Sequence, residues 1–315
     1  MVLGIQLRVI AMDFADKKIL FELDGNCRLS YRELADKLNI SSNAVRKRII
    51  NLIEVGVIVD FVVELTYAAA NSNLVICILQ TDGSERPEEF IDALGGYPSI
   101  IATFRETPQG YIVFGQCSGT EDISSMSVFI RGLRSVTHVA THIISHQPLP
   151  VGKKTEFTRI QLKVLKALLD DPRMSISDIS IKSGYTARRV RRTLEELYEG
   201  QGVHFGVYWN VNKGDNVYFL LESKWNEKEI QFSQLAENLE HHFPDTYWYS
   251  FVSATNPIIL SVFVIEHPRE IETITDKVLA VEGVESAHAH LLYPAKLYRY
   301  PLKDKLAEII KKSGL

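Results

Sequence analysis

The sequence contains few cysteines and no long apolar run, and each absence excludes a class of protein. Only three of the 315 residues are cysteine, at Cys27, Cys77 and Cys117, and no CxxC pair occurs. A zinc ribbon or a redox dithiol motif is therefore excluded, and we expect three reduced thiols in a reducing cytosol. No apolar run approaches the ~18 residues that a membrane-spanning helix needs.

The usual marks of export and of catalysis are also lacking. Met1–Met12 is apolar, but it is short, contains Arg8 and has neither the basic start nor the small-residue cleavage site of a signal peptide. The nucleophile motif GxSxG, the phosphate loop and the dinucleotide motif GxGxxG do not occur. We therefore expect a cytoplasmic protein that is not an enzyme and that has no catalytic residue, no cofactor and no membrane partner.

The composition that remains is ordinary for a globular protein, with a mild acidic excess. Hydrophobic residues make up 46% and charged residues 23%, which excludes a disordered, collagen-like or coiled-coil chain. The formal net charge is -4, from 35 basic and 39 acidic residues. A protein coated in positive charge is thereby excluded. A basic patch on one element is not, because the total hides the distribution.

The chain contains an internal repeat. When the sequence is shifted by 145 residues, Asp16–Glu54 aligns without a gap to Gln161–Glu199, and ten of the 39 pairs are identical. The identical pairs are Lys18/Lys163, Leu20/Leu165, Leu23/Leu168, Arg28/Arg173, Ser30/Ser175, Lys37/Lys182, Val45/Val190, Arg46/Arg191, Leu52/Leu197 and Glu54/Glu199. A repeat of this length predicts one structural unit that is present twice.

The first part of each repeat is all helical. Ser30 and Glu33 form a capping-box arrangement at the start of a second helix, and Ser41 is a good N-cap for a third. The second copy carries the same signals at Ser175, Asp178, Gly184 and Thr186. The buried stripes of the two third helices are Val45, Ile49 and Leu52, and Val190 and Leu194. Three short helices with a tight turn before the third predict a helix-turn-helix.

The second part of each repeat alternates strands and helices. In the first copy the segments are Leu74–Gln80, Glu88–Leu94, Ile100–Arg105, Tyr111–Cys117, Ile123–Leu133 and Val136–Ser145. In the second they are Val217–Glu222, Glu229–Phe243, Tyr247–Ala254, Ile258–Ile265, Pro268–Val281 and Val284–Tyr293. The order β-α-β-β-α-β is the ferredoxin-like plan.

We therefore predict an α+β protein of four domains. A helix-turn-helix domain at 1–60 precedes a ferredoxin-like domain at 61–147. A second helix-turn-helix domain at 148–210 precedes a second ferredoxin-like domain at 211–315, and both helical domains are winged-helix-like. The segment Gln147–Gly152 contains two prolines and a glycine, as a linker does, and Lys303–Leu315 is expected to form a terminal helix.

The helix after each tight turn carries the candidate DNA-binding residues. They are Ser42, Asn43, Arg46 and Lys47 in the first copy, and Arg188, Arg189, Arg191 and Arg192 in the second. Such a helix fits the major groove, where arginine pairs with guanine and asparagine with adenine while flanking cations hold phosphates. A solvated charged face is the alternative, but charge on the same helix of both copies favours double-stranded DNA as the partner.

The charge distribution agrees with this hypothesis. Residues 16–58 hold eight basic and six acidic residues, net +2, and residues 153–205 hold eleven and seven, net +4. The rest of the chain therefore carries -4 - 2 - 4 = -10. The acidic character belongs to the α/β parts, which are predicted to serve in pairing or small-molecule binding.

The nine histidines are the remaining candidates for metal ligands. On the predicted strands His138, His142 and His146 share one face, as do His288 and His290, and an i, i+2 pair can share a metal. No acidic or cysteine partner is visible nearby in the sequence, and His241 and His242 suit the end of a helix. We therefore interpret the histidines as structural or surface residues and predict no metal site.

The first repeat resembles the Lrp/AsnC (feast/famine) transcription regulators over Asp13–Gln147. The residues that carry the resemblance are Asp13, Asp16, Ile19, Leu20, Leu23, Asn26, Arg28, Ser30, Glu33, Leu34, Ala35, Leu38, Ile40, Ser41, Val45, Arg48, Leu52, Gly56, Val57 and Ile58. The second repeat matches more loosely, through Arg173, Ser175, Thr186, Val190, Leu194 and Leu197.

The resemblance implies several properties. They are an N-terminal helix-turn-helix, a β-α-β-β-α-β regulatory domain, homo-oligomers formed through the sheets, binding of palindromic promoter DNA, and effectors that are commonly amino acids. This chain departs from the family by holding two units covalently, so that one chain is a candidate pseudo-dimer. The family also has a glycine–aspartate signature between the two middle strands. The first copy has Gly110-Tyr111-Ile112 at this place, without the aspartate, and the second copy has Asn256-Pro257, without the glycine.

The leading hypothesis is a sequence-specific DNA-binding transcriptional regulator that forms homo-oligomers and takes a small-molecule effector. The first alternative is a tetrapyrrole (siroheme-type) decarboxylase of related architecture, in which Arg105, His142 and His290 would act. The second is an assembly partner that has lost DNA binding.

Overall fold

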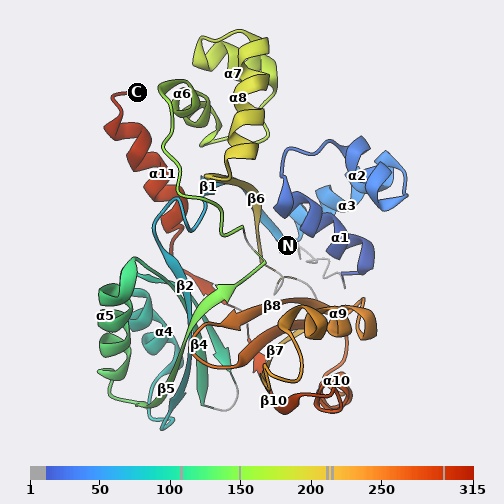
Figure 1. Cartoon of the computed structure of the whole chain (residues 1–315), viewed down its shortest axis with the longest axis vertical. Coiled ribbons are helices and arrows are strands. Elements are labelled where there is room, and N and C mark those ends of the chain that lie inside the picture. Colours follow the sequence, from blue (N-terminus) through green and yellow to red (C-terminus); the bar gives the residue numbers. More distant parts are fainter. Residues whose placement is uncertain (1–11, 107–108, 149, 211–212, 214–215, 294) are drawn as a thin grey trace, which may run out of the picture. The chain divides into compact units, whose positions relative to one another are not determined.

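The computed structural model describes residues 12–106, 109–148, 150–210, 213, 216–293 and 295–315. These residues form two compact units, and each unit draws on both halves of the sequence (Figure 1). Unit 1 contains the chain up to Ala69, Gly152–Asn216 and Leu302–Leu315, and unit 2 contains Ala70–Val151 and Val217–Pro301. The predicted boundaries at 60, 147 and 210 are not tested by this grouping and stay a prediction. Most of Met1–Met12 lies outside the described residues.

Unit 1 holds two helix-turn-helix modules and a terminal helix. The helices are α1 (Phe14–Gly25), α2 (Tyr31–Leu38) and α3 (Ser42–Glu54), then α6 (Arg159–Leu168), α7 (Ile176–Ser183) and α8 (Ala187–Gly200), and finally α11 (Pro301–Lys312). None of the helices in the described part of the chain has the length and apolar composition needed to cross a membrane.

The caps and turns of the two modules match, as the repeat predicts. Ser30 and Glu33 close a capping box at α2, and the Ser41 side chain accepts the amide of Ala44 at the start of α3. In the second module the Ser175 and Thr186 side chains accept the amides of Asp178 and Arg189. Asn39 and Gly184 end the preceding helices in the left-handed region, at φ 53° and 73°. The same turn therefore positions α3 and α8.

A two-stranded antiparallel ribbon joins the two modules within unit 1. It consists of β1 (Ile58–Leu65), which follows α3, and β6 (Val203–Trp209), which follows α8. Its central pairs are Phe61 with Val207 and Val62 with Gly206. Because residues 145 positions apart are equivalent in the repeat, this register places the ribbon's centre on a local two-fold axis. Neither strand was predicted from the sequence.

The contacts of two equivalent arginines follow the same two-fold relation. Arg28 Nη2 donates to the carbonyl of Met174 over 2.8 Å, and Arg173 Nη2 donates to the carbonyl of Leu29 over 3.1 Å. Leu29 and Met174 are themselves equivalent by the 145-residue shift. Each module therefore binds the other with the same residue, as in an isologous dimer interface.

Unit 2 contains the two β-α-β-β-α-β segments. The first comprises β2 (Asn73–Thr81), α4 (Pro87–Gly95), β3 (Ile100–Glu106), β4 (Gly110–Cys117), α5 (Gly119–Arg131) and β5 (Val136–His146). The second comprises β7 (Val217–Trp225), α9 (Phe232–His242), β8 (Tyr247–Ser253), β9 (Ile258–Ile265), α10 (Glu270–Leu279) and β10 (Val284–Leu292), with β11 (Lys296–Leu297) added. The predicted α+β class and element order are confirmed.

The two segments share one antiparallel sheet. Its strand order is β10-β7-β9-β8-β5-β2-β4-β3-β11, and a further pairing of β10 with β3 at Leu292 and Glu106 closes it. In the element order, β3 corresponds to β8 and β5 to β10. The two junctions between the segments, β5–β8 and β3–β10, are therefore equivalent. One chain thus forms internally a pairing of two related domains.

The helices of unit 2 cover one face of each segment's strands (Figure 1). Val75, Cys77 and Leu79 of β2 pack with Phe90 of α4 and Met126 of α5. In the second segment, residues of β7 and β9 pack with α9 and α10, namely Phe219, Leu221, Leu239, Phe263, Ile274 and Val278. The alternate residues of β2 and β7 point to the opposite face, which carries the buried histidines described below.

Candidate functional site

The predicted residues of α3 lie on its exposed side. Val45 is buried with Ile49 and Leu52, and the turn of the helix therefore leaves the side chains of the other face in solvent. Ser42, Asn43, Arg46 and Lys47 are all exposed. The last three also line a surface groove along α3, together with Ile50, Asn51 and Glu54. The four residues thus form one accessible polar and basic face.

Arg48, which is next to these residues in sequence, is held elsewhere. Its Nη2 lies 2.8 Å from Asp13 Oδ2, and its Nη1 lies 2.8 Å from Asp16 Oδ1. Asp13 caps α1, and Asp16 is buried. The basic triplet Arg46-Lys47-Arg48 therefore divides into two exposed cations and one that ties α3 to the start of α1.

The predicted residues of α8 form a similar but more basic face. Arg188, Arg191 and Arg192 are exposed, Arg189 is half-buried, and Val190 lies in the core. The Arg192 Nε lies 2.9 Å from Glu196 Oε1 one turn later, in an exposed ion pair that contributes little to stability. Arg188 and Arg191 thus lie on the outer face of α8 with the guanidinium of Arg192 beside them.

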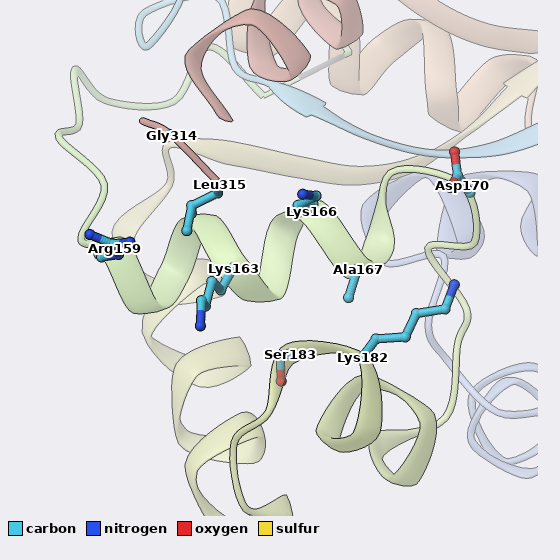
Figure 2. A pocket seen from close by; sticks show the side chains of 9 residues that line it. All are labelled: Arg159, Lys163, Lys166, Ala167, Asp170, Lys182, Ser183, Gly314 and Leu315. Atoms are coloured by element: carbon cyan, nitrogen blue, oxygen red, sulfur yellow. The ribbon is translucent and has the colours of Figure 1, made fainter. Parts of the chain in front are cut away.

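A second basic surface of the second module lies at α6 and α7 (Figure 2). This surface contains a pocket, which is lined by Arg159, Lys163, Lys166, Ala167, Asp170, Lys182, Ser183, Gly314 and Leu315. Figure 2 shows Arg159 at the start of α6 and the Lys182 side chain extending away from it. The four cations do not converge on one point, so the pocket adds diffuse positive charge rather than a site for one small anion.

A buried charged cluster links α1 to the ribbon of unit 1. His204 of β6 approaches Glu64 of β1 at 3.4 Å through Nδ1 and contacts the backbone carbonyl of Asp24 at 2.6 Å through Nε2. Burial by itself lowers the pKa of His204, but the hydrogen bond to Glu64 and the charge of Asp24 outweigh it and raise the pKa to about 9. An imidazolium therefore lies between two carboxylates at neutral pH.

A second buried histidine in unit 2 lies between two carboxylates. His290 of β10 has its Nδ1 2.8 Å from Glu106 Oε1 and its Nε2 3.0 Å from Glu222 Oε2. Burial opposes protonation, but hydrogen bonding to the two carboxylates raises the pKa of His290 to about 9. His288, two residues earlier on the same strand, is exposed, and its ring centroid is 4.7 Å from that of His290.

His142 occupies the equivalent position in the first segment but has different partners. It pairs with Ile76 on β2 as His290 pairs with Leu220 on β7. Its Nδ1 lies 3.3 Å from Ser253 Oγ, and its buried Nε2 has no hydrogen-bond partner among the described residues. Burial lowers the pKa of His142. The two junctions thus carry one charged and one neutral histidine.

The sequence predicts the helices of unit 1 but not the carboxylates that contact His290 in unit 2. All eight predicted DNA-contact residues lie on α3 and α8, which unit 1 holds as an equivalent pair. No acidic partner of His290 was expected from the sequence, yet Glu106, 184 residues away, and Glu222, 68 residues away, both contact it. The one local signal for β1 was its content of β-branched residues from Ile58 onward.

Comparison with known proteins agrees with these observations. A family model described as winged helix-turn-helix DNA-binding matches residues 12–59 and 157–199. The chain is 33% identical over 128 residues to the HTH-type transcriptional regulator LysM of Sulfurisphaera tokodaii, covering 41% of this chain and 89% of that protein. It is 30% identical over 141 residues to an uncharacterized HTH-type transcriptional regulator of Pyrococcus furiosus, covering 42% of this chain and 93% of that protein.

Similarity to a solved structure extends over nearly the whole chain. The siroheme decarboxylase NirDL superposes with a TM-score of 0.55 and 12% sequence identity, covering 96% of this chain and 100% of that one. At this identity the likeness shows the fold alone.

Two winged helix-turn-helix modules with exposed, charged third helices, together with paired α/β segments, define a helix-turn-helix regulator of tandem architecture. The chain belongs to the Lrp/AsnC family of HTH-type transcriptional regulators.

Proposed function

We propose that the protein binds double-stranded DNA as a sequence-specific transcriptional regulator and that one chain reads two half-sites. The observation that carries the proposal is the equivalence of α3 and α8. Both follow the same capped turn, both expose a basic face, and both lead into the strands of one two-fold ribbon. A pair of recognition helices related by a two-fold axis matches two half-sites of opposite orientation.

The residue roles follow from chemistry and exposure. Asn43 and Arg46 of α3, and Arg188 and Arg191 of α8, have side chains that pair with adenine or guanine in the major groove. Ser42, Lys47, Arg189 and Arg192 have groups that bind phosphate oxygens. Arg48 is omitted because Asp13 and Asp16 hold it. The positive charge around Lys163 and Lys166 adds to phosphate attraction on the second module.

The proposal is tested by selecting bound sequences from random DNA with the full chain and then measuring affinity for the selected DNA across salt. We expect the variant Arg188→Ala/Arg191→Ala/Arg192→Ala to bind at least ~10-fold more weakly. Its slope of log affinity against log salt should fall by about one for each phosphate that the variant no longer neutralises. The variant Asn43→Ala/Arg46→Ala/Lys47→Ala should behave likewise.

The matched control is Arg131→Ala/Lys228→Ala, which removes two exposed cations of unit 2. This control variant should bind the selected DNA with the affinity of the wild-type chain and with nearly the same slope of log affinity against log salt. Unchanged affinity and slope in the α8 variant would exclude that helix from the interface. A wild-type chain of normal oligomeric state that retains no DNA would favour the assembly-partner alternative.

We also propose that further homo-oligomers use surfaces other than the junctions between the two segments. The strand edges that join these segments are already paired within one chain, at β5–β8 and β3–β10. We further propose that the α/β segments bind a small-molecule effector. Light scattering of the purified chain, with and without candidate amino acids, measures both the assembly and its response.

A siroheme decarboxylase of related architecture is the second candidate function. It is favoured by the similarity to NirDL over nearly the whole chain and by the buried, equivalent positions of His142 and His290. Arg105 is exposed and lies 5.7 Å from the ring of Tyr293. Titration of the protein with siroheme without oxygen, followed by absorption and product mass, tests this candidate. Saturable binding that His142→Ala and His290→Ala abolish would support it.

A further inference from the structure

Three side chains of unit 2 bring metal-ligating atoms together on the sheet face opposite α4, α5, α9 and α10, and Glu222 lies beside them. Single ligand atoms from Glu106, His288 and His290 all lie within 4.8 Å of one another. Glu106 ends β3, whereas the two histidines are alternate residues of β10 and share one face. Glu222 of β7 lies opposite His288 in the strand register. The cluster thus combines three strands from the two segments.

The two nitrogens of His290 face different carboxylates. Nδ1 lies 2.8 Å from Glu106 Oε1, and Nε2 lies 3.0 Å from Glu222 Oε2. A histidine that binds a metal through one nitrogen commonly donates its other N–H to a carboxylate, which fixes the ring and its tautomer. Glu222 already holds Nε2 in this manner. Nδ1 is therefore the nitrogen available to a metal ion once its proton leaves.

We propose that Glu106, His288 and His290 bind one divalent transition-metal ion such as Zn²⁺, and that Glu222 positions the His290 ring. In this site the ion takes the place of the Nδ1 proton between His290 and Glu106, and the exposed His288 completes three protein ligands. Two imidazoles and one carboxylate match the donors of Zn²⁺ sites that leave a fourth position open to water or another molecule.

Charge and accessibility both suit such an ion. Two carboxylates supply two negative charges beside the histidines, and a divalent cation that displaces the proton balances them. His288 is exposed, so an ion reaches the cluster from solvent, and the buried His290 holds it from within. Because the ligands come from β3 and β10, the ion would strengthen the pairing that closes the sheet.

The equivalent junction lacks these ligands and serves as an internal comparison. His142 matches His290, but Ala140 stands opposite Ile78 where His288 stands opposite Glu222. Ser253 replaces Glu106 as the partner of the histidine Nδ1. Only one site of this kind is therefore expected among the described residues of a chain.

The test is calorimetric titration of the full chain with Zn²⁺, with Co²⁺ as a spectroscopic probe. We expect one equivalent of Zn²⁺ per chain at micromolar or tighter affinity and a rise in the unfolding temperature of about 2–4 °C at saturation. Bound Co²⁺ should show visible absorption bands of four- or five-coordination. Absence of saturable binding by the wild-type chain would overturn the proposal.

The variants separate this site from adventitious binding. His288→Ala removes an exposed ligand without disturbing the core, and it should lower Zn²⁺ affinity at least ~10-fold. Glu222→Gln should weaken binding about 10–100-fold while keeping the stoichiometry. His241→Ala/His242→Ala removes the neighbouring exposed histidines at the end of α9 and should change neither value. Binding that His288→Ala leaves intact, or that the His241/His242 variant removes, would overturn the assignment.

Discussion

Adjacent cations in this protein serve different purposes, and their neighbours decide which. Arg46 and Lys47 are exposed on α3, whereas Arg48 bridges Asp13 and Asp16. Arg28 and Arg173 direct their guanidinium groups to backbone carbonyls of the other module. A count of basic residues therefore overstates the charge available to DNA, and the proposed interface rests on cations that the structure leaves accessible.

At the residue scale, the His204 imidazolium predicts a pH-dependent stability. Its pKa is about 9 in the folded protein, against an ordinary value of about 6.5. A raised pKa gives stability that is fully present below about pH 6.5 and is lost as the pH rises through about 9. Relative to His204→Gln, the wild-type protein should lose on the order of 3 kcal/mol across this range.

Urea unfolding of both proteins at several pH values measures that difference, and the His290 contribution cancels because both proteins contain it. Asp24, whose pKa burial raises to about 6, titrates just below the range. A difference between wild type and variant that stays constant from about pH 6.5 to about pH 9 would contradict a charged His204.

At the element scale, the ribbon depends on a close approach at Gly206. A Cβ atom placed there would lie 2.2 Å from His204 Cε1 and 2.9 Å from Asp24 Oδ1. Gly206→Ala should therefore displace the imidazolium or the β1–β6 pairing and cost about 1–3 kcal/mol of unfolding free energy. Thermal or urea unfolding measures the cost.

The matched control for this substitution is Gly200→Ala at the end of α8. A Cβ atom at Gly200 meets nothing within 4 Å. The added methyl group should leave stability unchanged or raise it by up to about 1 kcal/mol, because alanine favours a helix over glycine. Equal destabilisation by the two substitutions would show that the contact with His204 does not matter.

At the scale of the whole molecule, the tandem repeat predicts an unusual stoichiometry. Unit 1 of one chain holds the two equivalent helices α3 and α8, so under the proposed function each chain should saturate two DNA half-sites. Titration of protein into the selected DNA at concentrations far above the dissociation constant measures half-sites per chain. A ratio of one half-site per chain would mean that only one of α3 and α8 engages DNA.

Much of the architecture follows from local sequence patterns. Ser30, Ser41, Ser175 and Thr186 predict helix starts because a side-chain oxygen satisfies an amide three residues later, and all four are caps in the structure. The order of strands and helices in unit 2 follows from period and turn residues in the same manner. The ribbon strands were missed because their pairing joins residues about 140 positions apart.

Some of the candidate site residues could be predicted from local sequence patterns, and others could not. The basic faces of α3 and α8 could be predicted, since helical periodicity determines which residues are opposite Val45 and Val190. The cluster around His290 could not, because Glu106 reaches it only through the closing pair of β3 and β10. Nothing in the spacing of Glu106 relates it to a histidine 184 residues later.

The sequence alone thus determined the duplicated unit, its helices and strands, and the basic faces, because these depend on contacts within a few residues along the chain. The tertiary structure alone decided how the copies combine. The tertiary structure determined the two-fold ribbon and the hydrogen bonds that Arg28 and Arg173 each donate to the other module. It also determined the different surroundings of His142 and His290. These depend on strand register across the repeat, where a shift of one residue would turn each side chain to the other face.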